Sequence, residues 1–318
     1  MRKSYILLFV LLFLMLLASC SSEDKSEKSK ETMSFGLLVT ESGLGDASYS
    51  DSALRGLEKA RDELGITFDY REPVERNFKE QLQELIDRDY DVIIGLGFNA
   101  QSAINELADQ YPKKQFILLD ADSDRENVIS ISFKVDEGSY LIGMLAGMKT
   151  KSDTVGFIGG EKLPAIQEFE QGFREGVKKV NKNAKVLVDY TGTFGDDKAG
   201  KDTANKQIKK GADFLFPVAG FTGIGALTEA QKKNIYAFGV DSDQFFVAEK
   251  AVVSSMLKNI DIALYNIVKE IVDGKAITGE HLELGIKEEG VGLAPIRIIK
   301  LSHNEQQKLN AVMEKGVD

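Results

Sequence analysis

The chain has 318 residues, of which 43% are hydrophobic and 28% charged, with 29 glycines and 5 prolines. This ordinary globular composition excludes a disordered, collagen-like or multi-span membrane protein, and the length allows about two domains. A net charge of −10 disfavours nucleic-acid binding, one cysteine excludes an internal disulfide, and two distant histidines leave little for a zinc site.

The first 20 residues predict a lipoprotein signal peptide. Two basic residues precede an apolar run over residues 5–18, which is shorter than a membrane span of about 20 residues and suits a signal peptide. Cys20 directly follows the sequence Leu-Ala-Ser, which resembles a bacterial lipobox. We expect removal of residues 1–19 and lipidation of Cys20, which would anchor the protein on the extracytoplasmic face of the cell membrane. An ordinary signal peptide with an incidental cysteine is the alternative.

The segment after the cysteine is expected to be a flexible tether. Residues 21–33 read SSEDKSEKSKETM and contain no aliphatic or aromatic side chain before the final methionine. Such a stretch cannot bury enough apolar area to offset the entropy of ordering it. Residues 20–33 are therefore predicted to be the lipidated cysteine and a solvated linker.

From Ser34 onward, short apolar runs rich in β-branched residues alternate with amphipathic stretches of helical period. The predicted strands are 34–40, 67–70, 91–96, 115–120, 128–133, 154–159, 184–189, 213–218, 235–240 and 252–257. The predicted helices are 51–64, 78–87, 100–110, 138–148, 166–180, 200–210, 224–233, 261–273 and a final one near 304–314.

This alternation predicts an α/β fold with two lobes, each built on a parallel sheet. Continuous apolar runs such as VIIGLG are typical of parallel strands covered by helices on both faces. In such sheets, ligands lie beyond the carboxyl ends of the strands. The segments that follow strands are therefore candidate site residues: 41–46, 98–99, 120–122, 160–162, 194–196, 220–222 and 241–244.

Signals for catalysis or a cofactor are weak. Gly95-Leu-Gly97 follows a strand, as in a dinucleotide-binding loop, but the third glycine is missing. The sequence contains neither a GxxxxGK(S/T) phosphate loop nor a GxSxG serine turn. Asp120 and Asp122 have no nucleophile or metal partner in the pattern, and they are interpreted as hydroxyl acceptors or helix caps. We predict no catalytic residue, no cofactor and no metal.

The informative positions after strands are one aromatic, two carboxylates and one lysine. Phe194 follows a strand, where it is either a ligand contact or a residue that packs under a loop. Asp241 and Asp243 are two residues apart, so both could point the same way and accept hydrogen bonds from a vicinal diol, or cap the next turn. Lys258 ends a strand and either donates into a cleft or lies on the surface.

Several separated stretches resemble the basic membrane protein family of bacterial lipoproteins. The matching stretches are SYSDSALRGLEKA (48–60), FKVDEGSYLIGMLAG (133–147), VGFIGGEKLPAIQEFEQGFREGVK (155–178), GTFGDDKAGKDTA (192–204), GADFLFPVAGFTGIGA (211–226), GVDSDQ (239–244) and SSMLKNIDIALY (254–265). The family is similar in fold to ribose-type periplasmic binding proteins, and it includes a purine nucleoside receptor. The resemblance therefore implies a substrate-binding subunit that captures nucleosides for an ATP-binding-cassette importer.

The resemblance also implies the arrangement of the lobes and the partners. Three chain crossings would join an N-terminal lobe (34–133 and about 245–285) to a C-terminal lobe (134–244 and about 286–318), with a ligand cleft between them. The implied partners are a small-molecule ligand, a nucleoside, and an ABC transporter permease. We expect a monomer that binds no nucleic acid and reaches the membrane through the lipid on Cys20.

Six positions carry over from the family's pattern onto this sequence. Phe194 would stack on a purine ring, a contact worth roughly 1–3 kcal/mol. Gly220 would let backbone approach the ligand, and at least one of Asp241 and Asp243 would bind ribose hydroxyls. Two charged positions complete the set: Asp120 and Lys258.

The first loop matches the family less well. Asp46, Ser48, Tyr49 and Ser50 are expected to contact the ligand, although Ser50 stands where relatives commonly have Asn. Gly45 stands where relatives commonly have an acidic residue, and Leu54 where they have an aromatic one. If that aromatic residue stacks on the second face of the base in relatives, Leu54 loses part of this stacking. Two alternatives follow: a receptor for another small polar ligand such as a pentose, or a regulatory or surface-interaction lipoprotein on the same fold.

Overall fold

The computed structural model describes residues 32–317, and the folded unit begins at Met33. The predicted signal peptide, the lipidated Cys20 and nearly all of the tether lie outside the described residues.

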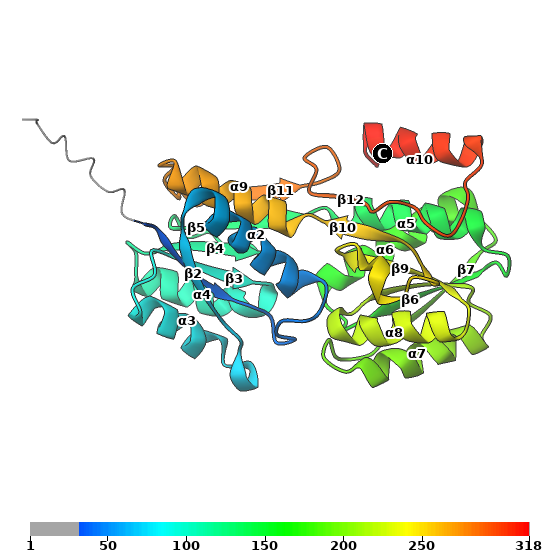
Figure 1. The fold of residues 1–318 in the computed structure, drawn as a ribbon, viewed down its shortest axis with the longest axis horizontal. Helices are drawn as coiled ribbons and strands as arrows, with labels where there is room; N and C mark the ends of the chain where they lie inside the picture. Colours follow the sequence, from blue (N-terminus) through cyan, green and yellow to red (C-terminus); the bar gives the residue numbers. More distant parts are fainter. Residues whose placement is uncertain (1–31, 318) are drawn as a thin grey trace, which may run out of the picture. The chain divides into compact units, whose positions relative to one another are not determined.

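The first sheet contains six parallel strands in the order β11-β5-β4-β3-β1-β2 (Figure 1). Its strands are β1 (Ser34–Leu38), β2 (Thr67–Arg71), β3 (Val92–Leu96), β4 (Gln115–Leu119), β5 (Val128–Phe133) and β11 (His281–Leu284). Its helices are α2 (Tyr49–Leu64), α3 (Phe78–Asp87), α4 (Phe98–Gln110) and α9 (Ile260–Val272), and a short 3₁₀ turn, η1, spans Val74–Arg76. The α2–α9 pair covers one face and the α3–α4 pair the other, as expected for strands that are apolar on both sides.

The second sheet also contains six strands, in the order β12-β10-β9-β8-β6-β7, and only the β10–β12 pair is antiparallel. Its strands are β6 (Thr154–Gly159), β7 (Lys185–Tyr190), β8 (Phe214–Val218), β9 (Tyr236–Asp241), β10 (Val252–Lys258) and β12 (Val291–Leu293). Its helices are α5 (Val135–Lys149), α6 (Pro164–Val180), α7 (Asp197–Lys209), α8 (Gly220–Lys232) and α10 (His303–Lys315), with a 3₁₀ turn η2 at Gln244–Val247.

The predicted α/β class with two lobes of parallel sheet is confirmed. The chain passes between the sheets after β5, after β10 and after β11. The structure differs from the expected boundary in one segment, because residues 245–258 lie in the C-terminal lobe: β10 pairs with β9, which precedes it. The crossing to the first lobe therefore comes at the start of α9. Sequence periodicity did not predict this, because it identifies a strand but not the sheet that the strand joins.

Close packing between α5 and α6 fixes the position of α6. A Cβ atom at Gly143 would lie 2.2 Å from the carbonyl oxygen of Phe173, and one at Gly176 would lie 2.0 Å from that of Tyr140. Only glycine allows the two backbones to approach so closely. The first turns of α6 are thereby held where they reach the pocket described below.

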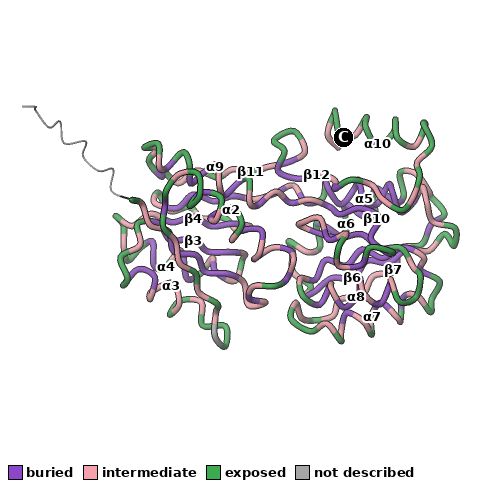
Figure 2. The backbone as a smooth tube through the Cα atoms, in the orientation of Figure 1, coloured by how far each residue is buried: buried purple, intermediate pink, exposed green. Residues whose placement is uncertain are grey.

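Burial follows the strands of both sheets, while the outer helix faces are exposed (Figure 2). In the part of the chain that the structure describes, no helix has both the length and the apolar character needed to cross a bilayer.

Candidate functional site

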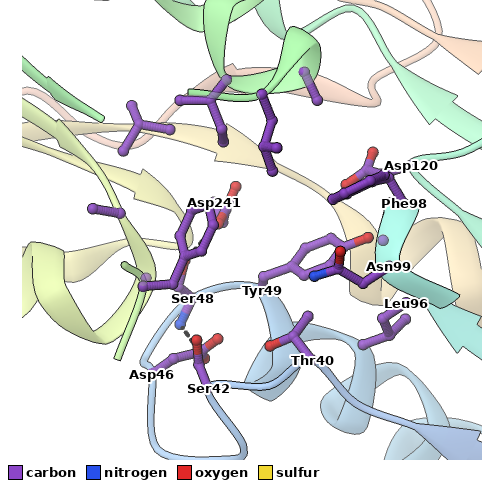
Figure 3. Close-up of a pocket in the computed structure, with 18 of the residues that line it drawn as sticks. Thr40, Ser42, Asp46, Ser48, Tyr49, Leu96, Phe98, Asn99, Asp120 and Asp241 are labelled. Atoms are coloured by element: carbon purple, nitrogen blue, oxygen red, sulfur yellow. Dashed lines mark hydrogen bonds between the residues drawn. The ribbon is translucent and has the colours of Figure 1, made fainter. Parts of the chain in front are cut away.

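A pocket lies at the carboxyl ends of the parallel strands of both sheets (Figure 3). Residues that follow β1, β3, β4 and β8 line it with the last residues of β9 and β10. The first residues of α2, α4 and α8 and the beginning of α6 also contribute. Its volume is about 900 Å³, including its mouth, which is within the range of small-molecule sites. The position agrees with the general rule for ligand binding in parallel sheets.

Eight of the ten predicted ligand-binding residues line this pocket: Asp46, Ser48, Tyr49, Asp120, Phe194, Gly220, Asp241 and Lys258. The structure therefore brings together residues that are more than 200 positions apart. Ser50 and Asp243 are not among the lining residues.

The first loop is organised around the carboxylate of Asp46, which is only 2% exposed. It accepts backbone N–H bonds from Ser48 (2.9 Å), Ser50 (3.0 Å) and Asp51 (3.3 Å). Burial raises the pKa of Asp46 to about 6, although these three hydrogen bonds act in the opposite direction. Asp46 thus shapes the loop that carries Ser48 and Tyr49 into the pocket.

Asp241 binds the first loop across the two lobes. The Ser48 hydroxyl donates to Oδ2 of Asp241 at 2.5 Å. Close by, the Ser242 hydroxyl and the Gln244 amide donate to the carbonyl oxygen of Ala47, at 2.5 and 3.2 Å. Burial raises the pKa of Asp241, opposed by the Lys258 charge and by the Ser48 hydrogen bond. Asp241 is therefore an acceptor held at the junction between the lobes.

Lys258, at the end of β10, forms an ion pair with Asp120, which directly follows β4. The two side chains are only 5% and 16% exposed. The ammonium group also lies 4.8 Å from the ring centroid of Tyr49 and 5.2 Å from that of Phe133. Burial, and secondarily Asp120, raise the pKa of Tyr49 well above its usual range, so the phenol stays protonated.

The two predicted residues outside the lining have partners of their own. The hydroxyl groups of Ser50 and Thr40 are 2.9 Å apart. Asp243 pairs with Arg297 at 2.8 Å and accepts the backbone N–H of Phe245 at 3.3 Å. Asp241 adopts a left-handed φ of 63° at the end of its strand, so the period of two that would align Asp241 with Asp243 ends there.

Phe194 is held against two glycines. A Cβ atom at Gly160 would lie 2.3 Å from Cε1 of the Phe194 ring, so this position requires glycine. The Phe194 carbonyl accepts the N–H of Thr222 at 2.9 Å, and Gly220 has a φ of 53° beside it. Phe194 is half-buried, with its ring on the pocket wall.

Several other residues line the pocket; of these, the sequence placed Phe98 and Asn99 in a candidate segment without a specific role and did not identify the others. Phe78, Phe98 and Asn99 come from the first turns of α3 and α4, and the beginning of α6 supplies an apolar face: Leu163, Ala165, Ile166 and Phe169. The position of Phe98 and Asn99 after a strand was the available signal. Leu54, which stands where relatives commonly have an aromatic residue, lies outside the lining. The presence of leucine at this position therefore does not remove an aromatic ring from the pocket.

The charges of the lining disfavour anionic ligands. Four carboxylates (Glu41, Asp46, Asp120 and Asp241) face one lysine, which Asp120 already pairs. Glu41 accepts a hydrogen bond from Arg76 at 2.9 Å. Among residues 32–317, no group of three or more His, Cys, Asp or Glu side chains is placed to hold a metal. The arrangement suits an uncharged ligand with an apolar ring and several hydroxyl groups.

The fold and the pocket together define a solute-binding protein of the type I periplasmic class. A solved structure from Aeropyrum pernix K1, described as an ABC transporter system solute-binding protein, shares this fold with a TM-score of 0.81. It is 24% identical in sequence, and the match covers 89% of this chain and 90% of that one. The family model described as ABC transporter substrate-binding protein PnrA-like (Bmp) matches residues 34–317, and the chain belongs to this family.

Two relatives carry informative names. An uncharacterized lipoprotein of Pyrococcus abyssi is 35% identical over 92% of this chain and 77% of its own length. The ABC transporter nucleoside-binding protein BmpA of Lactococcus lactis is 29% identical over 87% of this chain and 86% of its own length. The predicted family is thus confirmed. As an ABC transporter substrate-binding protein, the chain has a small-molecule ligand and a permease as partners.

Proposed function

We propose that this protein captures nucleosides, with purine nucleosides preferred, for an ABC importer. The main support for this proposal is the composition of the pocket. The aromatic rings of Phe194 and Tyr49 line it together with the hydrogen-bond acceptors Asp241 and Asp120. Aromatic faces suit a base and carboxylates suit a ribose diol, while the excess of negative charge disfavours nucleotides. The name of the Lactococcus relative supports the same ligand class.

Each residue has a proposed role in binding. Phe194 stacks on the base, and Tyr49 contacts the ligand from the other lobe. Asp241 accepts hydrogen bonds from the ribose through Oδ1, the carboxylate oxygen that Ser48 does not use. Lys258 and Asp120 act as a pair that donates to and accepts from the sugar, and the backbone at Gly220 approaches the ligand closely.

The mechanism is capture by lobe closure, without a chemical step. The bonds from Ser48 to Asp241 and from Ser242 to Ala47 join the two lobes beside the pocket. A ligand that contacts both lobes at once favours the closed arrangement by its difference in affinity between the open and closed forms. The permease would then distinguish closed from open receptors. The protein is accordingly proposed to be a binding protein and not an enzyme.

The anchor is proposed from the sequence. Cys20 would carry the lipid on the extracytoplasmic face of the membrane, and residues 21–33 would let a monomeric folded unit reach its ligand. The lipoprotein name of the Pyrococcus relative supports this arrangement.

Calorimetric titration of the chain lacking residues 1–20 tests the ligand class. Because the folded unit begins at Met33, this truncation leaves it intact. The protein is refolded once to remove bound ligand and titrated with adenosine, guanosine, inosine, uridine, adenine and ribose. We expect micromolar or tighter binding of purine nucleosides and none of ribose. Binding of ribose alone would identify a sugar receptor, and silence from folded protein would contradict solute capture of either kind.

A further inference from the structure

Helix α4 begins inside the pocket because of the turn at Gly97. This glycine has a φ of 76°, and its N–H donates to the carbonyl of Leu119 at 2.8 Å, which ties the end of β3 to β4. A Cβ atom at Gly97 would lie 3.9 Å from the Tyr49 ring. The next two residues, Phe98 and Asn99, therefore enter the pocket beside Tyr49 and Asp120 (Figure 3).

Asn99 differs from the other polar side chains of the lining in its hydrogen bonding. Eight polar or charged lining residues have a hydrogen-bond or ion-pair partner within the protein: Thr40, Glu41, Asp46, Ser48, Tyr49, Asp120, Asp241 and Lys258. Within residues 32–317, the carboxamide of Asn99 has no hydrogen-bond partner. Among the other described polar side chains of the lining, only the hydroxyl of Ser42 also lacks one. A partly buried amide without a partner leaves one donor group and one acceptor atom for whatever enters the pocket.

The surroundings of Asn99 indicate what the amide would bind. Its neighbour Phe98 is 48% exposed although its ring lines the pocket, and Tyr49 packs on the turn that precedes it. A planar ring that lies among these aromatic side chains would present its edge to the carboxamide. A carboxamide places donor and acceptor side by side in one plane, as in its paired contacts with adenine.

We propose that Asn99 is a specificity-determining residue that reads the edge of the ligand's base. The inference rests on the proposed nucleoside function and extends it. Because the carboxamide can rotate by half a turn, it would pair with 6-amino and 6-oxo purines alike at the edge formed by N1 and the 6-substituent. To form both hydrogen bonds, the carboxamide requires a base edge that carries a donor next to an acceptor. A purine without a 6-substituent offers acceptors only.

The test compares purine riboside, which lacks the 6-substituent, with adenosine and inosine on wild-type protein and on Asn99→Leu. In the wild type, we expect the better of adenosine and inosine to bind about tenfold more tightly than purine riboside, the effect of one good hydrogen-bonded pair. In Asn99→Leu, that ratio falls to about twofold or less while the affinity for purine riboside stays nearly constant. Asn99→Ala serves as a second variant, and thermal unfolding verifies that both fold.

The matched control is Asn266→Leu, the same substitution at an exposed position of α9 outside the lining. It should leave all three affinities unchanged. If nucleosides bind but the ratio is the same in wild type and in both Asn99 variants, Asn99 does not read the base and the nucleoside function stands. If no nucleoside binds to folded wild-type protein, the proposed function itself fails, and the role of Asn99 fails with it.

Discussion

The polar and the aromatic side chains of the pocket contrast in their partners. The polar cluster, defined as Asp46, Ser48, Asp120, Asp241 and Lys258, is bonded within itself or to backbone. The aromatic wall, defined as Phe78, Phe98 and Phe194, presents partly exposed ring surface to the pocket. From this difference we propose that the polar cluster, besides its contacts with the ribose, stabilises the fold and joins the lobes, whereas the aromatic wall contributes mainly to affinity for the base.

Removal of the lysine from the polar cluster should have the largest effect. In Lys258→Met, the carboxylate of Asp120 loses its ion-pair partner. Both side chains are largely buried, with Lys258 5% and Asp120 16% exposed. Loss of one partner of a buried pair costs about 3–5 kcal/mol of unfolding free energy, which urea unfolding measures. The double variant Asp120→Asn/Lys258→Met should recover much of this loss. A single variant as stable as the wild type would show that the polar cluster does not stabilise the fold.

The pH dependence of stability tests Asp46 in the same cluster. Because its folded pKa of about 6 lies above the ordinary 3.8, the folded state binds this proton more tightly than the unfolded state. The resulting stabilisation is complete below about pH 3.8 and is lost as the pH rises through about 6. A shift of about two units corresponds to about 3 kcal/mol.

Asp46→Asn removes this titration. Its unfolding free energy relative to wild type should therefore rise by about 2.4 kcal/mol between pH 4 and pH 7, since part of the full effect lies below pH 4. Denaturant titrations at several pH values measure the difference, and Asp51→Asn, which changes a neighbouring carboxylate in the same loop, is the control. A difference that is flat over this range would mean that Asp46 is not a buried acid with a raised pKa.

The aromatic wall should behave in the opposite way, with an effect on binding and little on stability. Phe194→Ala should weaken nucleoside binding by roughly 1–3 kcal/mol because the base loses a stacking face. Phe246→Ala, at a ring that is 77% exposed and outside the lining, is the matched control. Calorimetry gives the affinity and thermal unfolding the stability. A stability loss with unchanged affinity would make Phe194 a packing residue and would break the contrast.

The contrast also explains which parts of the molecule the sequence predicts. Elements inside the sheets and helix layers, such as α3 and β6, agree with the predicted ranges because their apolar pattern is sufficient to identify them. Strands β11 (His281–Leu284) and β12 (Val291–Leu293) were not predicted. They are short and form at sheet edges, where pairing with β5 and β10 supplies what local propensity lacks.

The candidate site shows the same limit. The position at a strand end left two interpretations open for Asp241 and Lys258, and the family resemblance favoured the pocket, which both residues line. The backbone turns at Asp241, so that Asp243 pairs with Arg297 outside the pocket lining. This turn depends on a left-handed φ at Asp241, which residue spacing does not reveal. The exposed state of Phe98 and the unpartnered amide of Asn99 likewise depend on which neighbours fold around them.

An ion pair at the mouth of the pocket extends the comparison to exposed charges. Arg76 donates to Glu41 of its own lobe at 2.9 Å and to Glu161, which follows β6 of the other lobe, at 2.8 Å. It joins the lobes as Lys258 does, but its side chain is 61% exposed. Water and salt therefore screen the attraction, and such pairs contribute little.

Arg76→Ala should thus give the smallest effect, a loss of nucleoside affinity of a few-fold at most that disappears in molar salt. Arg61→Ala is the matched control, since its pair with Asp62 lies within α2 and joins no lobes. Titrations at low and high salt measure both variants. If Arg76→Ala weakened binding as much as Phe194→Ala does, and did so in molar salt, lobe closure would depend on this exposed pair. Burial would then not be what separates the strong contacts of the pocket from the weak ones.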